Sequence, residues 1–291
     1  MSAGRTASVV VVVVAVLGLP ACQGDGADRG AAGAPAREDL AASTRPTTSS
    51  RAVPGRELLL TFDDGAAPVG SVIGSVANRG RQEVEVAMVT HNGGRIVREV
   101  GTAGTGARLP AVDEDETTAA AAAVVVRPVG PKDRLSPGGA RFVISADFVL
   151  DADSVAPHDD GDNIVQRGLY ADAAQYKLQV DGRRVSCRVE GDRGEVVVRS
   201  SLAVRPGRWY SATCSRRGQR LTLTVAGVRN NLAWARPRAW TASGPIGSVA
   251  FDPAVPVTVG AKVLAAGDIA TSDSDQFNGA LDNVRIDRPG R

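Results

Sequence analysis

From residue 57 onward, the chain is built from short segments in which apolar and polar residues alternate, separated by turn-forming residues. This alternation has the two-residue period of a β-strand that is buried on one face. No segment carries an apolar face at the 3.6-residue period of a helix over the length of a typical helix. The sequence therefore predicts an all-β sandwich or barrel.

Two of these segments need closer inspection. In TTAAAAAVVVRPV (117–129), the alanines favour a helix, but the valine run and Pro128 favour an extended chain, so we interpret the segment as a strand. VEVAMVT (84–90) is followed by HNGG and then RIVREV (95–100), a pattern typical of a β-hairpin.

The segment YKLQVDGRRVSCRV (176–189) predicts a second hairpin. A two-residue turn at Asp181–Gly182 would place Tyr176 opposite Cys187. In this register Cys187 lies on the apolar face, and Cys214 is likewise in phase with apolar neighbours in RWYSATCSR. Both cysteines are therefore predicted to point into the interior.

The N-terminus resembles a bacterial lipoprotein signal. The apolar run Val9–Leu19 is too short to span a membrane and is typical of a signal peptide. It ends in Leu19-Pro20-Ala21-Cys22, which is similar to the lipobox, although Pro20 departs from the usual Ser, Ala or Thr. The resemblance implies that residues 1–21 are removed and that Cys22 is lipidated. An ordinary secretory signal with an incidental cysteine is the alternative.

Residues 22–55 follow as a predicted flexible tether. Between Gln23 and Gly55 there is scarcely any large apolar residue, so this part of the chain cannot bury enough surface to offset the entropy of ordering. A folded domain is expected over residues 56–288. The expected location is the outer face of the bacterial cytoplasmic membrane, with the membrane contacted through the lipid anchor.

The expected export of the domain bears on the redox state of the other two cysteines. Of three cysteines, one is the predicted lipid site, which leaves Cys187 and Cys214 in an oxidising compartment. Their spacing relative to His91 and His158 fits no zinc motif, and neither histidine is an evident partner for a nucleophilic cysteine. We predict a Cys187–Cys214 disulfide. Because strands two positions apart in a sheet are beyond bonding reach, EVVVRS (195–200) must not lie between the two cysteines.

The charge of the chain argues against one class of partner. The formal net charge is +2, and no run of five like charges occurs. Nucleic-acid-binding domains usually carry a strong basic patch, so no nucleic-acid partner is predicted.

The order of motifs in the second half resembles a laminin-G-like domain of the concanavalin-A-like lectin/glucanase superfamily. The resemblance rests on RRVSCRVEG, VVVRSS, PGRWYSATCSRRG, LTLTVAG, VTVGAK and DQFNGALDNVRI, in that order. It extends over residues 57–288 and is most pronounced after Ala140. It implies a jelly-roll sandwich of two antiparallel sheets with adjacent first and last strands.

The resemblance also implies a function. Such a domain would be a non-catalytic recognition module for a glycan or a cell-envelope partner, and no cofactor is required. Many family members hold a structural calcium at the edge of the sandwich, for which Asp63, Asp64 and Asp282 are the candidate ligands.

A glucanase-like glycoside hydrolase is one alternative, because some superfamily members use Glu-x-Asp-x-x-Glu. Glu190-Gly191-Asp192-Arg193-Gly194-Glu195 has these letters, but its glycines predict a turn, so we assign no catalytic residue. A purely structural envelope protein is the other alternative.

The sequence offers one candidate ligand-binding segment, NNLAWARPRAWTASG (230–244). Sugar-binding clefts usually need an aromatic platform and fixed polar groups, which Trp234, Trp240, Asn230 and Asn231 would supply. The alternative is that both indole rings cover the hydrophobic core.

Overall fold

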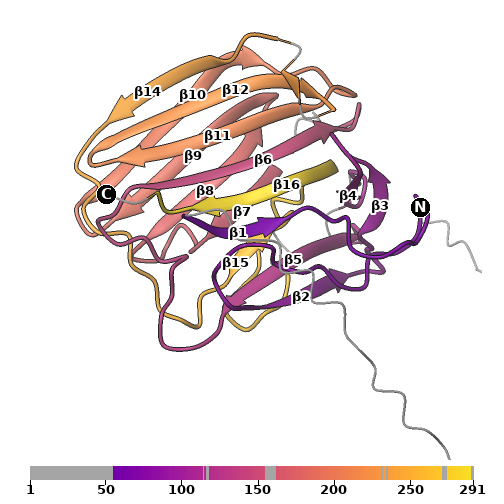
Figure 1. Cartoon of the computed structure of the whole chain (residues 1–291), viewed down its shortest axis with the longest axis horizontal. Coiled ribbons are helices and arrows are strands. Elements are labelled where there is room, and N and C mark those ends of the chain that lie inside the picture. Colours follow the sequence, from indigo (N-terminus) through magenta and orange to yellow (C-terminus); the bar gives the residue numbers. More distant parts are fainter. Residues whose placement is uncertain are drawn as a thin grey trace, which may run out of the picture. The chain divides into compact units, whose positions relative to one another are not determined.

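The computed structural model describes residues 55–113, 115, 118–154, 162–230, 232–233, 235–270 and 274–289, all within the unit Ser49–Arg291. In these ranges the chain forms strands in two antiparallel sheets and no helix (Figure 1). The prediction of an all-β sandwich is therefore confirmed. A helix suited to crossing a membrane is accordingly absent from the described ranges. The predicted signal peptide, Cys22 and nearly all of the tether lie outside them.

Sheet A has the strand order β13-β12-β11-β6-β16-β4-β3, with β14 beside β12 and β1 beside β16. Its strands are β1 (Arg56–Leu60), β3 (Val97–Val100), β4 (Thr105–Arg108), β6 (Phe142–Leu150), β11 (Tyr210–Arg217), β12 (Arg220–Arg229), β13 (Leu232–Ala233), β14 (Arg238–Ser243) and β16 (Gly279–Asp287).

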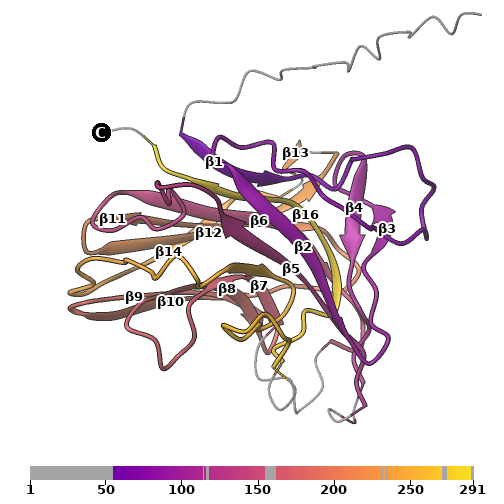
Figure 2. The ribbon, with the colours of Figure 1, turned by 90° about the horizontal axis from the view of Figure 1, so that it is seen from below.

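Sheet B has the order β10-β9-β8-β7-β15-β5-β2. Its strands are β2 (Val84–His91), β5 (Ala121–Pro128), β7 (Asp162–Arg167), β8 (Gln175–Asp181), β9 (Arg184–Gly191), β10 (Gly194–Ala203) and β15 (Val257–Val259). Figure 2 shows β6, β11 and β12 of sheet A in one layer and β8, β9 and β10 of sheet B in the other.

The first and last strands of the described domain are neighbours. β1 pairs with β16 in antiparallel register, with Leu60 opposite Val284. This adjacency is the one that the resemblance implied, and it joins segments more than 200 residues apart in the chain.

The hydrophobic core fills the space between the sheets. Along β11 the inward residues Tyr210, Ala212 and Cys214 are buried, whereas the residues between them are only partly buried. Inward residues of β8 and β9 form the opposite wall of the same core. The two-residue alternation seen in the sequence is thus the alternation between core and outer surface.

The alanine- and valine-rich segment forms β5, as predicted, and is buried on both faces. Ala122 and Val124 face the core between the sheets. Ala121, Ala123 and Val125 face the other side, where they pack against a second cluster formed by Ala261, Val263 and Ile269. Because both faces of β5 are covered, its sequence lacks the polar positions of a half-exposed strand.

The β8–β9 hairpin differs from its predicted register by two residues. Its turn is Gly182–Arg183, and Tyr176 pairs with Val189 while Leu178 pairs with Cys187. Both turn residues have positive φ, 51° for Gly182 and 67° for Arg183, as a type I′ turn requires. A shift of two residues preserves the face on which each side chain lies, so the prediction that Cys187 points inward is confirmed.

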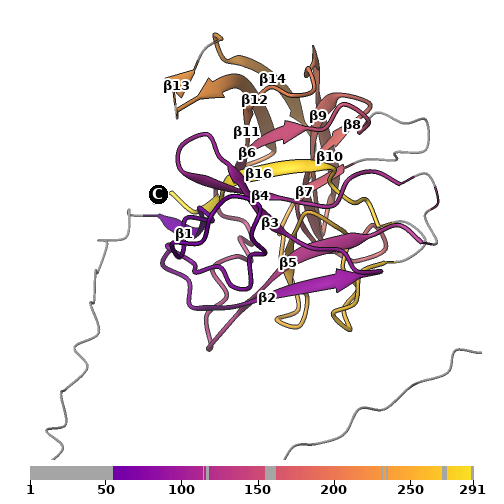
Figure 3. The ribbon, with the colours of Figure 1, turned by 90° about the vertical axis from the view of Figure 1, so that its right-hand side faces the viewer.

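The predicted hairpin over residues 84–100 is wrong. β2 pairs with β5 in sheet B (Figure 3), whereas β3 pairs with β4 in sheet A. Asn92 and Gly93 adopt positive φ, and Gly94 lies so close to the backbone of Ala121 that a side chain would collide with it. The chain therefore leaves sheet B at this point, and Ile96 enters the core on the way to the other sheet.

The predicted disulfide is present. Cys187 in β9 and Cys214 in β11 are bonded with a Cα–Cα distance of 6.2 Å, and the bond links sheet B to sheet A through the core. β10, which contains EVVVRS, lies on the far side of β9 and not between the cysteines. Both parts of the prediction are confirmed.

The buried Arg216 in β11 ties three loops together at one end of the sandwich. Its guanidinium donates to the carbonyls of Gly138 at 2.9 Å and Gly218 at 3.0 Å, and also to that of Gly247. Burial lowers the pKa of Arg216, and the nearby charge of Asp192 opposes that effect.

Candidate binding groove

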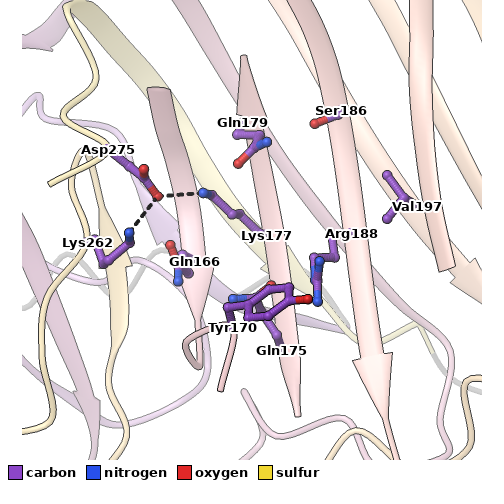
Figure 4. Close-up of a pocket in the computed structure, with 10 residues that line it drawn as sticks. All are labelled: Gln166, Tyr170, Gln175, Lys177, Gln179, Ser186, Arg188, Val197, Lys262 and Asp275. Carbon is purple, nitrogen blue, oxygen red and sulfur yellow. Dashed lines mark hydrogen bonds and ion pairs between the residues drawn. The ribbon is translucent and has the colours of Figure 1, made fainter. Parts of the chain in front are cut away.

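The outer face of sheet B is divided into a covered half and an open half. Over β15, β5 and β2, the connection from β15 to β16 folds back and covers the outward alanines of β5. Over β7, β8, β9 and β10 the face is open and forms a groove of about 340 Å³ (Figure 4). This volume is at the lower end of the range of about 300–1,000 Å³ typical of ligand sites.

The strands contribute seven side chains to this groove, Gln166, Gln175, Lys177, Gln179, Ser186, Arg188 and Val197. Tyr170, Lys262 and Asp275 complete the lining from the adjoining loops.

Strand geometry explains why these side chains point outward. Lys177 and Gln179 alternate along β8 with residues that are fully buried in the core. On β9, Ser186 and Arg188 alternate in the same way with Cys187 and its buried neighbours. The disulfide and the groove therefore lie on opposite faces of the same strand.

One side of the groove is a compact charge cluster. Lys177 Nζ lies 2.6 Å from Asp275 Oδ2, and Lys262 Nζ lies 3.5 Å from the same oxygen (Figure 4). The Asp275 side chain is only 5% exposed, so the two ammonium groups compensate a largely buried carboxylate.

Buried amides hold the floor of the groove in place. Gln166 donates to the carbonyl of Gly168 at 2.7 Å and accepts a hydrogen bond of 2.5 Å from Asn163. Gln175 donates to the same carbonyl at 3.1 Å. Because these amides are hydrogen-bonded and buried, the floor is rigid.

Two other groove side chains have uncommitted polar atoms. Within the part of the chain that the structure describes, Gln179 Oε1 accepts no hydrogen bond. Arg188 Nε likewise has no hydrogen-bond partner among the described residues, and Ser186, two positions before it on β9, is 5% exposed. Buried polar atoms are nearly always paired, so these two atoms are suited to a bound ligand or to water.

Tyr170 supplies an aromatic surface at the edge of the groove. Its side chain is 78% exposed, and the guanidinium carbon of Arg188 lies 4.6 Å from the ring centroid. Arg188 in turn contacts Glu190 at 2.9 Å and Glu195 at 2.5 Å. The ring is therefore held by a cation–π contact whose cation is itself fixed by two carboxylates.

Glu190 and Glu195, the residues of the Glu-x-Asp-x-x-Glu pattern, flank the turn between β9 and β10 and lie opposite each other. Glycoside hydrolysis by two carboxyl groups needs one group protonated and the other ionised. Here both carboxylates contact the same Arg188 guanidinium. This geometry orients Arg188.

The predicted ligand segment lies elsewhere. Trp240 in β14 packs against the core between the sheets, and its Nε1 donates to Ser201 Oγ at 3.0 Å. Asn230 lies in the exposed turn after β12. Neither residue lines the groove, and Trp234 and Asn231 lie outside the described residues.

The three candidate calcium ligands contact N–H and hydroxyl groups. Asp63 accepts from the Thr105 amide at 2.8 Å, and Asp64 pairs with Arg79 at 2.7 Å. Asp282 is fully buried and accepts from the amide and hydroxyl of Thr102. Calcium takes six to eight oxygen ligands, whereas these carboxylates are occupied by hydrogen-bond donors. Across the described ranges no cluster of three or more His, Cys, Asp or Glu residues that could hold a metal ion is found, and a structural calcium at these aspartates stays a prediction.

The groove was missed although its central strands were examined in the sequence. The outward residues of the β8–β9 hairpin, from Lys177 to Arg188, are polar at alternate positions, and this pattern marks a solvated face. Nothing in the pattern indicated that Tyr170 or the segment carrying Asp275 would adjoin that face. Their contribution depends on the course of the loops.

Similar structures support the fold. The binding domain of Paraclostridial Mosquitocidal Protein 1 is 12% identical, with 81% of this chain and 49% of that chain covered and a TM-score of 0.52. The binding domain of Botulinum neurotoxin serotype D is 10% identical, with 81% and 48% covered and a TM-score of 0.51. This chain thus spans about half the length of these two structures. At such identities the likeness shows the fold alone.

Other comparisons concern the sequence and a laminin fragment. The LG1-3 region of the laminin alpha2 chain is 16% identical, with 57% of this chain and 30% of that chain covered, at a TM-score of 0.44 that is too low to support an inference. No curated protein matches the chain. The family model of the laminin G domain matches residues 167–288, which include β8, β9 and β10 of the groove. The second half of the described sandwich is therefore similar in sequence to laminin G domains.

Proposed function

We propose that the described domain is a non-catalytic recognition module that binds a glycan in the groove on sheet B. The observation that carries this proposal is the composition of the groove: a fixed, exposed Tyr170 ring lines the same groove as the hydroxyl of Ser186 and the amide of Gln179, whose Oε1 accepts no hydrogen bond from a described residue. Sugar rings combine apolar C–H faces with hydroxyl groups that both donate and accept. An aromatic surface with adjacent neutral polar groups matches that chemistry.

The comparisons are consistent with a binding role. The laminin G match covers three of the four groove strands, β8, β9 and β10, and the two toxin structures are described as binding domains. The shared guanidinium between Glu190 and Glu195 is the reason to prefer recognition over hydrolysis. A protein of the cell envelope is the other partner class that such a module serves.

The module is further proposed to be exported and anchored by a lipid on Cys22, with residues 22–55 as a tether. The lipobox-like Leu19-Pro20-Ala21-Cys22 supports this proposal. The Cys187–Cys214 disulfide adds support, because such bonds persist in oxidising compartments outside the cytosol. Cys22→Ser is expected to abolish acyl labelling and to release the protein from membranes. Retention in the membrane without label would contradict the anchor.

A glycan array probed with the purified chain tests the binding role. Tyr170→Ala is expected to weaken binding to the best glycan about tenfold through the loss of aromatic contact. Val100→Ala, at an exposed position on sheet A, is the matched control and should leave binding unchanged. Equal glycan binding by the wild type and by Tyr170→Ala would show that the groove is not the binding site. If the wild type releases reducing ends from the glycan and the double variant Glu190→Gln with Glu195→Gln does not, the domain is a glycoside hydrolase and not a recognition module.

A further inference from the structure

Every cation that lines the groove is compensated by a carboxylate. Lys177 and Lys262 share Asp275, and Arg188 is shared by Glu190 and Glu195. Among the described residues, these three positive and three negative charges give a net charge of zero at the groove.

The same pairing extends to the rim. Arg199 on β10, opposite Ser186, contacts Asp181 Oδ2 at 2.6 Å and also donates to the Asp181 carbonyl. Arg184 lies closer to the hairpin turn and does not line the groove.

The paired lysines are poorly placed to bind an anion. The side chains of Lys177 and Lys262 are 13% and 18% exposed, and that of Asp275 is 5% exposed. An anionic ligand group that recruited either lysine would approach Asp275 and compete with it. A buried carboxylate that loses its partner is strongly destabilised. The geometry therefore disfavours carboxylate, sulfate and phosphate groups in this groove.

Apart from the Nε–H of Arg188, whose guanidinium is compensated by Glu190 and Glu195, the groups that the described lining offers a ligand are neutral. Gln179 offers an amide and Ser186 a hydroxyl, and each can donate and accept. Tyr170 offers an apolar ring face. Together these groups complement the hydroxyls and C–H faces of a sugar without acidic substituents.

We infer that the ligand of this groove is an uncharged glycan, not a uronate-containing or sulfated one. This inference rests on the proposed function and narrows its substrate class. It also predicts that Asp275 sets the specificity against acidic glycans, because its ion pairs with Lys177 and Lys262 keep both ammonium groups from binding a ligand anion.

The test compares the purified chain on two panels. The neutral panel contains β-glucan, arabinan and mannan, and the acidic panel contains polygalacturonate and chondroitin sulfate. The wild type is expected to bind a neutral polysaccharide with an affinity that changes less than about twofold between low and high salt, because no ion pair to the ligand is screened. Tyr170→Ala should weaken that binding about tenfold. Asp275→Asn should create salt-sensitive binding to the acidic panel.

The outcomes separate this inference from the proposed function. Preferential, salt-sensitive binding of an acidic polysaccharide that is weakened by Tyr170→Ala would overturn the uncharged class and leave glycan recognition intact. Binding to neither panel would overturn both. If Asp275→Asn fails to fold, Glu190→Gln with Glu195→Gln at the exposed edge frees Arg188 and is expected to produce the same gain toward acidic polysaccharides. No gain in either folded variant would contradict the role given to the paired carboxylates.

Discussion

The stability of the domain is expected to fall as the pH rises from 5 to 7, because of a buried acid cluster at Asp282. Asp282 in β16 is fully buried, and Asp147 in β6 is 8% exposed. The hydroxyl oxygen of Thr102 lies 2.9 Å from a carboxylate oxygen of each, and Asn283 Nδ2 donates to the same hydroxyl and to Asp147. A single hydroxyl hydrogen serves only one of the two carboxylates. One additional proton makes both contacts favourable.

The position of this proton determines the sign of the effect. Burial raises the pKa of Asp282 from 3.8 to about 7; the charge of Asp147 adds to the increase, while the hydrogen bonds from Thr102 and Asn283 oppose it. Between these two pKa values the folded protein holds a proton that the unfolded chain releases. The resulting stability is fully present below pH 3.8 and is lost as the pH rises through 7. From pH 5 to pH 7 the loss is about 2 kcal/mol, because the slope of 1.36 kcal/mol per unit falls to half of that value at the folded pKa.

Urea unfolding at pH 5, 6, 7 and 8, followed by circular dichroism, measures this slope. The matched variant is Asp282→Asn, which removes the titrating group. It also loses one acceptor for the surrounding N–H groups, so it should be less stable at pH 5 but should lack the slope between pH 5 and 7. The same slope in both proteins would refute the assignment. If the variant does not fold, the carboxyl carbon shift of Asp282 in the wild type reports the titration directly by NMR.

Two further predictions concern the covalent and polar links between loops and sheets. Reduction of the Cys187–Cys214 bond, or the double variant Cys187→Ala with Cys214→Ala, should lower the free energy of unfolding by about 3–4 kcal/mol. The reason is that the bond closes a loop of 27 positions in the unfolded chain. An unchanged urea midpoint would contradict this prediction. Arg216→Ala should cost about 3 kcal/mol because three hydrogen bonds to loop carbonyls are lost, and Arg216→Lys should recover only part of that loss. A cost below 1 kcal/mol would mean that water replaces the guanidinium.

The features that the sequence predicts correctly are those encoded by local alternation. The inward position of Cys187 follows from period two, which is unchanged by a register error of two residues. The exact pairing was missed because it depends on whether Arg183 adopts a positive φ, and an arginine does so only when the turn type demands it. The disulfide was predictable because the expected export, and the pair of cysteines that remains once Cys22 is set aside, point to it independently of the register.

The features that were missed depend on where a chain changes sheets. The segment 84–100 has the pattern of a hairpin, yet the close approach of Gly94 to Ala121 sends the chain from sheet B to sheet A. For Trp240 the sequence left two positions open, an exposed platform and a cover for the hydrophobic core. In the fold, β14 pairs with β12 and turns the indole toward the core.

The position of the groove follows from the residue types on the outer face of sheet B. On β5 the outward residues, such as Ala121 and Ala123, are small and apolar, and the chain's own β15–β16 connection packs against them. On β8 and β9 the outward residues, such as Lys177 and Ser186, are polar, so that nothing apolar is available to attract the connection further across the sheet. The covering segment therefore ends at the charge cluster, where Lys262 and Asp275 form the wall of the groove. The apolar outward residues of β5 are thus covered by the β15–β16 connection, whereas the polar outward residues of β8 and β9 stay open as the groove. A ligand is consequently expected to extend from this wall across β8 and β9 toward Tyr170.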